Sequence, residues 1–218
     1  MKGKIVTIDA GGATTTIVNK IVDCGADCII GLKGNQPASK KLTEKLLERQ
    51  EFKDSNKAIF TKNKGHGRQE TREYKLINMG SLNTSGLEKE IKKFKKKWPD
   101  IASIGVANMN VITYAKNKST IRFFLTTLTN LNEFAEATRI HWQIESRLHW
   151  VLDVVLREDH CRTRNGNSAS NLSLIRKIAL NLLTINSNQK NGTRLKQIKC
   201  SNDKNFLMKI LGGFKTIN

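Results

Sequence analysis

The sequence predicts an α/β fold, and three observations support this class. Residues 1–55 alternate strand, helix, strand and helix, which is typical of a parallel sheet. Residues 56–128 are rich in alternating apolar and polar positions, which indicates a mostly β insertion. Residues 129–186 have apolar residues at helical spacing, and a basic tail, residues 187–218, follows them. These four stretches are the expected domain organisation.

The first part is expected to contain two strands and two helices. "KIVTIDA" (4–10) is a short apolar run closed by two glycines, which predicts a buried strand and a turn. Residues 13–24 have a helical apolar repeat and stop before Gly25. "DCIIGLK" (27–33) predicts a second strand, and 38–50 an amphipathic helix.

The middle part predicts two hairpins separated by a helix. Residues 59–78 are interpreted as two strands around a turn at 64–67. The basic run "EKEIKKFKKK" (88–97) predicts a helix. Strands are expected within 101–112 and 119–128, joined near Lys116-Asn117.

The helical block is expected to bury one face of each of its two helices. The loop 157–167 separates these helices, and the tail from Asn186 onward is expected to pack weakly because it has seven Lys or Arg and one acid. The apolar residues that repeat at helical spacing are Phe134, Ala137, Ile140, Ile144, Leu148, Val151 and Val155 in the first helix, and Leu172, Ile175, Ile178, Ala179, Leu182 and Leu183 in the second.

Charge is the strongest bulk signal. Thirty-eight Lys and Arg oppose 19 Asp and Glu, a formal net charge of +19. Such a field attracts polyanions, and nucleic acid is the commonest of these. A Lys- and Asn-rich coding bias explains part of the excess of positive charge.

No run of 18 apolar residues and no signal peptide is recognised, so a cytoplasmic protein with four free thiols is expected.

Two carboxylates stand out. Asp9 closes the first predicted strand, and sites in open α/β sheets collect at the carboxyl ends of strands. Glu145 lies four residues from both His141 and His149, so the three share one helix face. Three interpretations stay open: a His–Glu–His zinc site, a single metal-binding carboxylate with flanking groups that touch phosphate, and the polar flank of an amphipathic helix. The nearby Trp150 is interpreted as an anchor at the core edge.

Several strings, taken together and in order, resemble a known family. The similarity runs from about residue 4 to about residue 183, and the fifth string is the longest and most specific. These strings resemble the carboxyl-terminal part of the H-repeat-associated, ISAs-type insertion-sequence transposases, which are DDE transposases with an RNase H-like fold. The strings are "VTIDA", "LKGNQ", "GHGRQETREY", "WPDIASIGV", "HWQIESRLHWVLDVVLRED" and "RTRNGN…NLSLIRKIALNLL".

The resemblance implies a metal-dependent phosphoryl transfer on DNA. Asp9 matches the family's second acid and Glu145 its third, so both are expected to be catalytic and to hold Mg²⁺ or Mn²⁺. Two such ions, about 3.5–4 Å apart, activate the attacking oxygen and stabilise the departing one. The expected partner is double-stranded DNA, both transposon ends and target, bound by a homodimer in a synaptic complex.

The resemblance also implies that the β-rich insertion contacts transposon-end DNA. Arginine suits phosphate because its planar fork donates two hydrogen bonds at once. A solvated surface charge is the alternative for each candidate. The residues expected to contact DNA are Lys33, Arg68, Arg72, His141, Arg157, Arg162 and Arg164.

One departure from the family pattern affects the expected activity. The family's first Asp lies on a strand well upstream of "TIDA", whereas Met1 is only eight residues before Asp9. The sequence therefore predicts an incomplete RNase H-like fold, with an unpaired edge on the first strand, and a truncated transposase that is inactive alone. The alternative is a non-catalytic, basic DNA-binding remnant.

Overall fold

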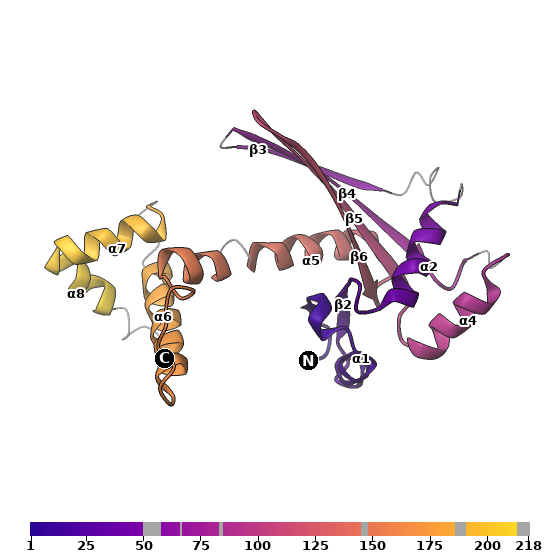
Figure 1. The fold of residues 1–218 in the computed structure, drawn as a ribbon, viewed down its shortest axis with the longest axis horizontal. Coiled ribbons are helices and arrows are strands. Elements are labelled where there is room, and N and C mark those ends of the chain that lie inside the picture. Colours follow the sequence, from indigo (N-terminus) through magenta and orange to yellow (C-terminus); the bar gives the residue numbers. More distant parts are fainter. Residues whose placement is uncertain (50–57, 66, 83–84, 145–147, 186–190, 213–218) are drawn as a thin grey trace. The chain divides into compact units, whose positions relative to one another are not determined.

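The computed structural model describes residues 1–49, 58–65, 67–82, 85–144, 148–185 and 191–212. The chain divides into two compact units, Met1–His141 and Trp142–Asn218. Figure 1 shows the order of the elements along the chain. The two units are described one at a time.

The first unit is a mixed α/β unit, and its strands and helices occur where the sequence predicts them. Six strands and four α-helices are described in it, and α5 continues past its last residue. The strands are β1 (Ile5–Ile8), β2 (Asp27–Leu32), β3 (Ile59–Gly65), β4 (Arg68–Asn78), β5 (Ser103–Thr113) and β6 (Asn117–Thr126), and the helices are α1 (Thr15–Asp23), α2 (Pro37–Leu47), α4 (Glu88–Lys97) and α5 (Leu131–Ile144).

The described strands form one curled sheet in the order β1-β2-β6-β5-β4-β3. Only β1 and β2 are parallel, and every other pairing is antiparallel. Strand β6 pairs with β2, for example Ile29 opposite Thr126, so the β-rich middle of the chain continues the sheet that β1 and β2 begin. Beyond the helices, β3 to β6 extend as a long twisted ribbon (Figure 1).

The main core lies between one face of the sheet and the helices α1, α2 and α4. Side chains from alternate strand positions, such as Ile30 and Ile104, pack there with Leu42 of α2 and Phe94 of α4. Trp98, which follows α4, is only 1% exposed, and its Nε1–H donates a hydrogen bond to the hydroxyl of Ser39, 3.1 Å away. These contacts fix the helices against the sheet.

Helix α5 packs on the opposite face through Phe134. The Phe134 ring makes edge-to-face contacts with Tyr74 and Phe124, at centroid distances of 6.4 Å and 5.7 Å. A Cβ on Gly105 would overlap this ring, so the absence of a side chain on β5 creates the space that Phe134 fills. The described part of α5 is thereby anchored over the middle of the sheet.

The second unit is helical. The prediction of a weakly packed tail is wrong for its described helices, because α7 and α8 pack against α6. Leu182 and Leu183 of α6 form a small core with Phe206 and Ile210 of α8, and Cys200 of α7 packs against it. The buried Lys196 ammonium donates to the Leu183 carbonyl, 2.7 Å away, near the carboxyl end of α6. The described elements of the second unit after α5 are the π-helix η3 (Val151–Val155), α6 (Ser168–Ile185), α7 (Thr193–Asn202) and α8 (Lys204–Gly212).

The prediction of fully buried helix faces is only partly right. Phe134, Val151, Leu182 and Leu183 are buried as expected. However, five of the predicted core residues are between 37% and 59% exposed, because no described part of their own unit covers them. They are Ile140, Ile144, Leu148, Ile175 and Ile178.

Candidate functional site

Asp9 directly follows β1, at the carboxyl end of the strand. Successive side chains of a strand point to opposite faces. Val6 and Ile8 pack into the main core, so Thr7 and Asp9 belong to the opposite face, on which α5 packs. The Asp9 side chain is 68% exposed, so its carboxylate is accessible to ligands from solvent.

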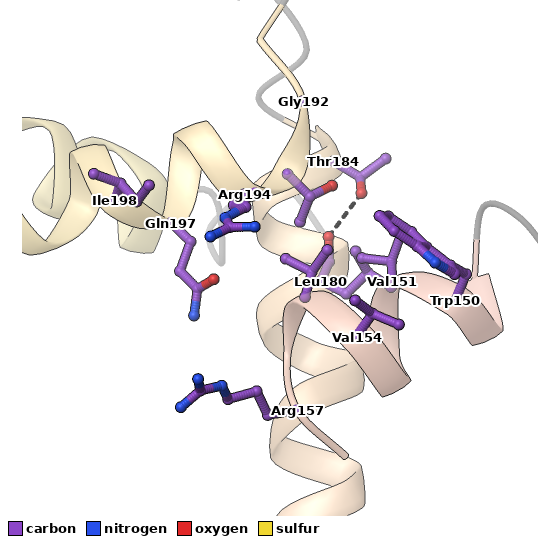
Figure 2. Close-up of a pocket in the computed structure, with 12 residues that line it drawn as sticks. Trp150, Val151, Val154, Arg157, Leu180, Thr184, Gly192, Arg194, Gln197 and Ile198 are labelled. Carbon is purple, nitrogen blue, oxygen red and sulfur yellow. Dashed lines mark hydrogen bonds between the residues drawn. The ribbon is translucent and has the colours of Figure 1, made fainter. Parts of the chain in front are cut away.

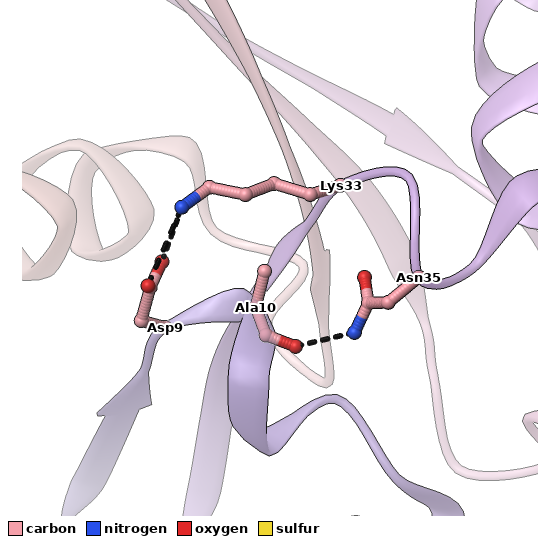
Figure 3. A network of polar contacts seen from close by, with 4 residues as sticks. All are labelled: Asp9, Ala10, Lys33 and Asn35. Carbon is pink, nitrogen blue, oxygen red and sulfur yellow. Dashed lines mark hydrogen bonds and ion pairs between the residues drawn. The ribbon is translucent and has the colours of Figure 1, made fainter.

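Lys33 is the cation that contacts Asp9. Its Nζ lies 3.3 Å from Oδ1 and 3.4 Å from Oδ2 of the carboxylate (Figure 3). Lys33 directly follows β2, and β2 runs parallel to β1, with Ile8 opposite Ile30. The carboxyl ends of the two strands therefore meet at the same edge of the sheet and bring this pair together.

The loop after β2 also binds the turn that follows Asp9. The Asn35 Nδ2 donates to the Ala10 carbonyl, 2.6 Å away (Figure 3), and the Gln36 Nε2 donates to the Ala13 carbonyl, 2.8 Å away. Gly31 allows the close approach, since a Cβ there would lie 3.0 Å from the Ala10 backbone nitrogen.

The pKa of Asp9 is lowered from its ordinary value of 3.8. The backbone N–H of Ala10 is the largest cause, because it donates to the carboxylate and stabilises the charged form. Partial burial opposes this effect, and the hydrogen bond and charge of Lys33 and the charge of His141 add to it. Asp9 is therefore ionised at neutral pH, as a metal ligand has to be.

His141 lies in the same neighbourhood. Its ring Nδ1 is 3.0 Å from the Thr7 hydroxyl oxygen, so the imidazole of α5 contacts β1 two residues before Asp9. Glu145, the second predicted catalytic carboxylate, lies outside the described residues. In the sequence it follows His141 by four residues.

Among the described residues, Asp9 is the carboxylate that the sequence predicts as a metal ligand. No group of three His, Cys, Asp or Glu side chains that could hold a metal occurs among them. Mg²⁺ binds oxygen, keeps several waters and takes one or two carboxylates together with substrate phosphate. An exposed, ionised carboxylate such as Asp9 fits that donor set as one of its protein ligands.

Arg68 and Arg72 lie on β4 and both pair with the buried carboxylate of Glu70. The Arg68 side chain is 53% exposed, whereas that of Arg72 is only 13% exposed. Arg68 is thus the more accessible of the two, and Arg72 serves mainly to neutralise Glu70 within the sheet.

The remaining predicted DNA contacts belong to the second unit. Arg157, Arg162 and Arg164 are all exposed. Arg157 has a positive φ of 55°, which is uncommon for a residue with a side chain. Arg164 donates from Nη1 to the carbonyls of Cys161 and Thr163, at 3.0 Å and 2.9 Å.

A hollow of about 880 Å³ lies within the second unit, between η3, α6 and α7. Figure 2 shows Arg157, Arg194 and Gln197 among its lining side chains. Trp150 also lines it and is 55% exposed, next to the buried Val151. The lining is largely apolar, with two arginines and no acid.

Three further residues shape the site, although no sequence pattern marks them. Gly31, Asn35 and Gln36 hold the Asp9 turn, yet each is an ordinary loop or strand residue by type. For Asn35 and Gln36 the available signal was the "LKGNQ" string (32–36), in which only Lys33 received a role, and Gly31 directly precedes that string.

No helix in the described part of the chain is long and apolar enough to cross a membrane. The four cysteines are free thiols, of which Cys28 is buried and Cys24 is exposed.

Comparison with known proteins places the chain among transposases. "Putative protein YbfL" and "H repeat-associated putative transposase YhhI", both of Escherichia coli K12, are each 33% identical over 219 residues, which cover 98% of this chain and 56% of the relative. "Putative transposase YncI" of Escherichia coli O157:H7 is 33% identical over 227 residues, with 99% and 56% covered. The chain thus spans about half the length of these relatives. The family described as "Transposase DDE domain" matches residues 1–182, and the chain belongs to this family.

Proposed function

We propose that the chain is part of a DDE transposase that acts on insertion-sequence DNA by metal-dependent phosphoryl transfer. The observation that carries this proposal is the contact between His141 and Thr7, 3.0 Å long. It brings α5 to the strand whose end bears Asp9, and Glu145 follows His141 by four residues in the sequence. Convergence of the two acids is the geometry that the reaction requires.

In this proposal, Asp9 and Glu145 hold Mg²⁺ or Mn²⁺ together with oxygens of the DNA phosphate. The bound ions supply the activation of the attacking oxygen and the stabilisation of the leaving one. The residues themselves supply ionised oxygen ligands, and the low pKa of Asp9 supports that role. A covalent protein intermediate is not required.

Double-stranded DNA is the proposed partner, both transposon ends and target, in a synaptic complex built on a homodimer. The net charge of +19 supports attraction to DNA, and the exposed Lys33, Arg68 and Arg157 offer cations for phosphate. Chromosomal insertion sequences lie in the bacterial cytoplasm, where we place the reaction.

We further propose that the sheet is the core of an RNase H-like fold, completed by an additional strand beside β1. Among the described residues, β1 pairs only with β2, and Ile5 is 37% exposed. A hollow of about 290 Å³ lies between β1 and α5, lined by Ile5, Ala137 and Ile140 among others. A parallel strand on this edge would bring its own carboxyl end next to Asp9.

These 218 residues contain counterparts of two of the family's three acids. We therefore propose that they cleave DNA poorly by themselves and act with a polypeptide that carries the remaining acid. The test mixes the purified chain with the portion of YhhI that these residues do not match, and measures nicking of supercoiled plasmid in Mg²⁺. The mixture is expected to nick, and neither part alone.

The controls separate catalysis from DNA binding. Asp9→Asn should abolish nicking by the mixture while DNA binding stays unchanged or tightens slightly, because a repulsive charge is removed. Asp23→Asn, at an exposed acid of α1, should leave both unchanged. Robust nicking by the 218 residues alone would contradict the proposed inactivity. Tight DNA binding with no nicking under any condition would favour the non-catalytic DNA-binding alternative.

A further inference from the structure

The Lys33 ammonium lies where a cation can contact both oxygens of one carboxylate. Its Nζ is 3.3 Å from Oδ1 and 3.4 Å from Oδ2 of Asp9. No other ion pair to Asp9 occurs among the described residues. Lys33 is thus the counter-ion of this carboxylate in the free chain.

This ion pair is weak and easily exchanged. The two side chains are 66% and 68% exposed, and solvent-exposed pairs contribute little to stability. Breaking the pair therefore costs the fold little. A competing cation on Asp9, or a competing anion on Lys33, is enough to separate the two side chains.

The backbone on both sides of the pair is held, so the exchange requires only side-chain motion. Asn35 binds the Ala10 carbonyl and Gln36 binds the Ala13 carbonyl, which ties the loop after β2 to the turn after β1. Lys97 donates to Gln36 at 2.6 Å and supports that loop from α4. The flexible part of the arrangement is the four-carbon Lys33 side chain.

We propose that Lys33 occupies the cation position on Asp9 in the free chain, and that a DNA phosphate draws it away and leaves the carboxylate to the divalent ion. This inference rests on the proposed function, since it takes Asp9 as a metal ligand. A divalent ion and an ammonium repel each other on one carboxylate. A phosphate beside the strand ends offers the ammonium an alternative partner.

The exchange couples metal binding to DNA binding. Without DNA, Lys33 competes with the metal and lowers its affinity. With DNA, Lys33 binds phosphate, and the competition disappears. Because such coupling is reciprocal, the metal must also tighten the binding of DNA, by the same factor. Lys33 thereby delays the loading of metal until substrate is present.

The experiment measures Mn²⁺ binding by the full 218-residue chain, using the electron paramagnetic resonance signal of free Mn²⁺. Lys33→Met is expected to bind Mn²⁺ about two- to fivefold more tightly than the unchanged chain, the change that the loss of one exposed ion pair produces. The control is Lys45→Met, which removes a comparable exposed pair with Glu90, 2.9 Å long, and should not change Mn²⁺ binding.

A second arm adds a short duplex of mixed sequence. DNA should raise the Mn²⁺ affinity of the unchanged chain more than that of Lys33→Met, and Lys33→Arg should behave like the unchanged chain. Equal affinities of the unchanged chain and Lys33→Met without DNA would overturn the role of Lys33.

Asp9→Asn distinguishes a failure of the proposed role of Lys33 from a failure of the proposed metal site. If Asp9→Asn abolishes Mn²⁺ binding but Lys33→Met has no effect, the coupling is wrong and the metal site stands. If Asp9→Asn leaves Mn²⁺ binding intact, Asp9 is not a metal ligand, and the proposed function and the coupling fail together.

Discussion

The Nδ1 atom of His141 lies 3.0 Å from the hydroxyl oxygen of Thr7, although 134 positions separate the two residues in the chain. Thr7 is two residues before Asp9 and belongs to the same face of the sheet. The helix that continues toward Glu145 in the sequence therefore contacts the strand that ends in Asp9. The contact thus joins two segments that lie far apart in the sequence.

The first prediction concerns the acidity of Asp9. A carbon-detected NMR titration of the side-chain carboxyl should give a pKa below 3.8. A lowered pKa in the folded chain means that the stabilising effect of the charge is present above 3.8 and is lost as the pH falls through the lowered value. Lys33→Met should raise the pKa only in part, because the Ala10 amide remains. An unchanged pKa in Lys33→Met would contradict the observed pairing.

The second prediction concerns Gly31. A Cβ there would lie 3.0 Å from the Ala10 nitrogen and 3.4 Å from Asp9 Oδ1. Gly31→Ala should lower the free energy of unfolding by about 1–3 kcal/mol, as overpacking does, in urea denaturation. The matched control is Gly34→Ala, where a Cβ would meet no atom within 4 Å. Equal stability of the two variants would show that the strand ends are less tightly apposed.

The third prediction concerns Phe134. Phe134→Ala should lower the free energy of unfolding by about 3–5 kcal/mol, because it empties the space over Gly105 and loses two edge-to-face ring contacts. Phe60→Ala, at a side chain that is 67% exposed, should change it by less than about 0.5 kcal/mol. Urea denaturation of both variants measures the difference. A loss in Phe134→Ala no larger than in Phe60→Ala would disprove the anchoring of α5.

The fourth prediction concerns Arg68. The logarithm of DNA affinity should fall linearly with the logarithm of salt concentration, and Arg68→Ala should make that slope shallower by about 0.9, the value for one phosphate contact. Fluorescence anisotropy at several salt concentrations gives the slope. Lys45→Met removes a cation of α2 that is not among the proposed DNA contacts, and it should leave the slope unchanged. Identical slopes for Arg68→Ala and the unchanged chain would remove Arg68 from the proposed DNA surface.

The local pattern of the sequence determined the elements of the first unit. Strands β1 and β2, the two hairpins and the basic helix α4 all lie where apolar alternation and turn residues predict them. The family was also readable from the sequence, because long specific strings such as "HWQIESRLHWVLDVVLRED" carry it. Local periodicity and motif identity need no knowledge of which segments meet in space.

The tertiary structure decided which segments meet. No local pattern predicts that β6 pairs with β2, that Lys33 contacts Asp9, or that Asn35 holds the turn after β1. It also decided burial: Ile175 repeats like a core residue and is 59% exposed, whereas Lys196 lies in a basic tail and is buried. The physical reason is that periodicity defines the face of a helix or strand, whereas contact and burial depend on what other segments cover that face.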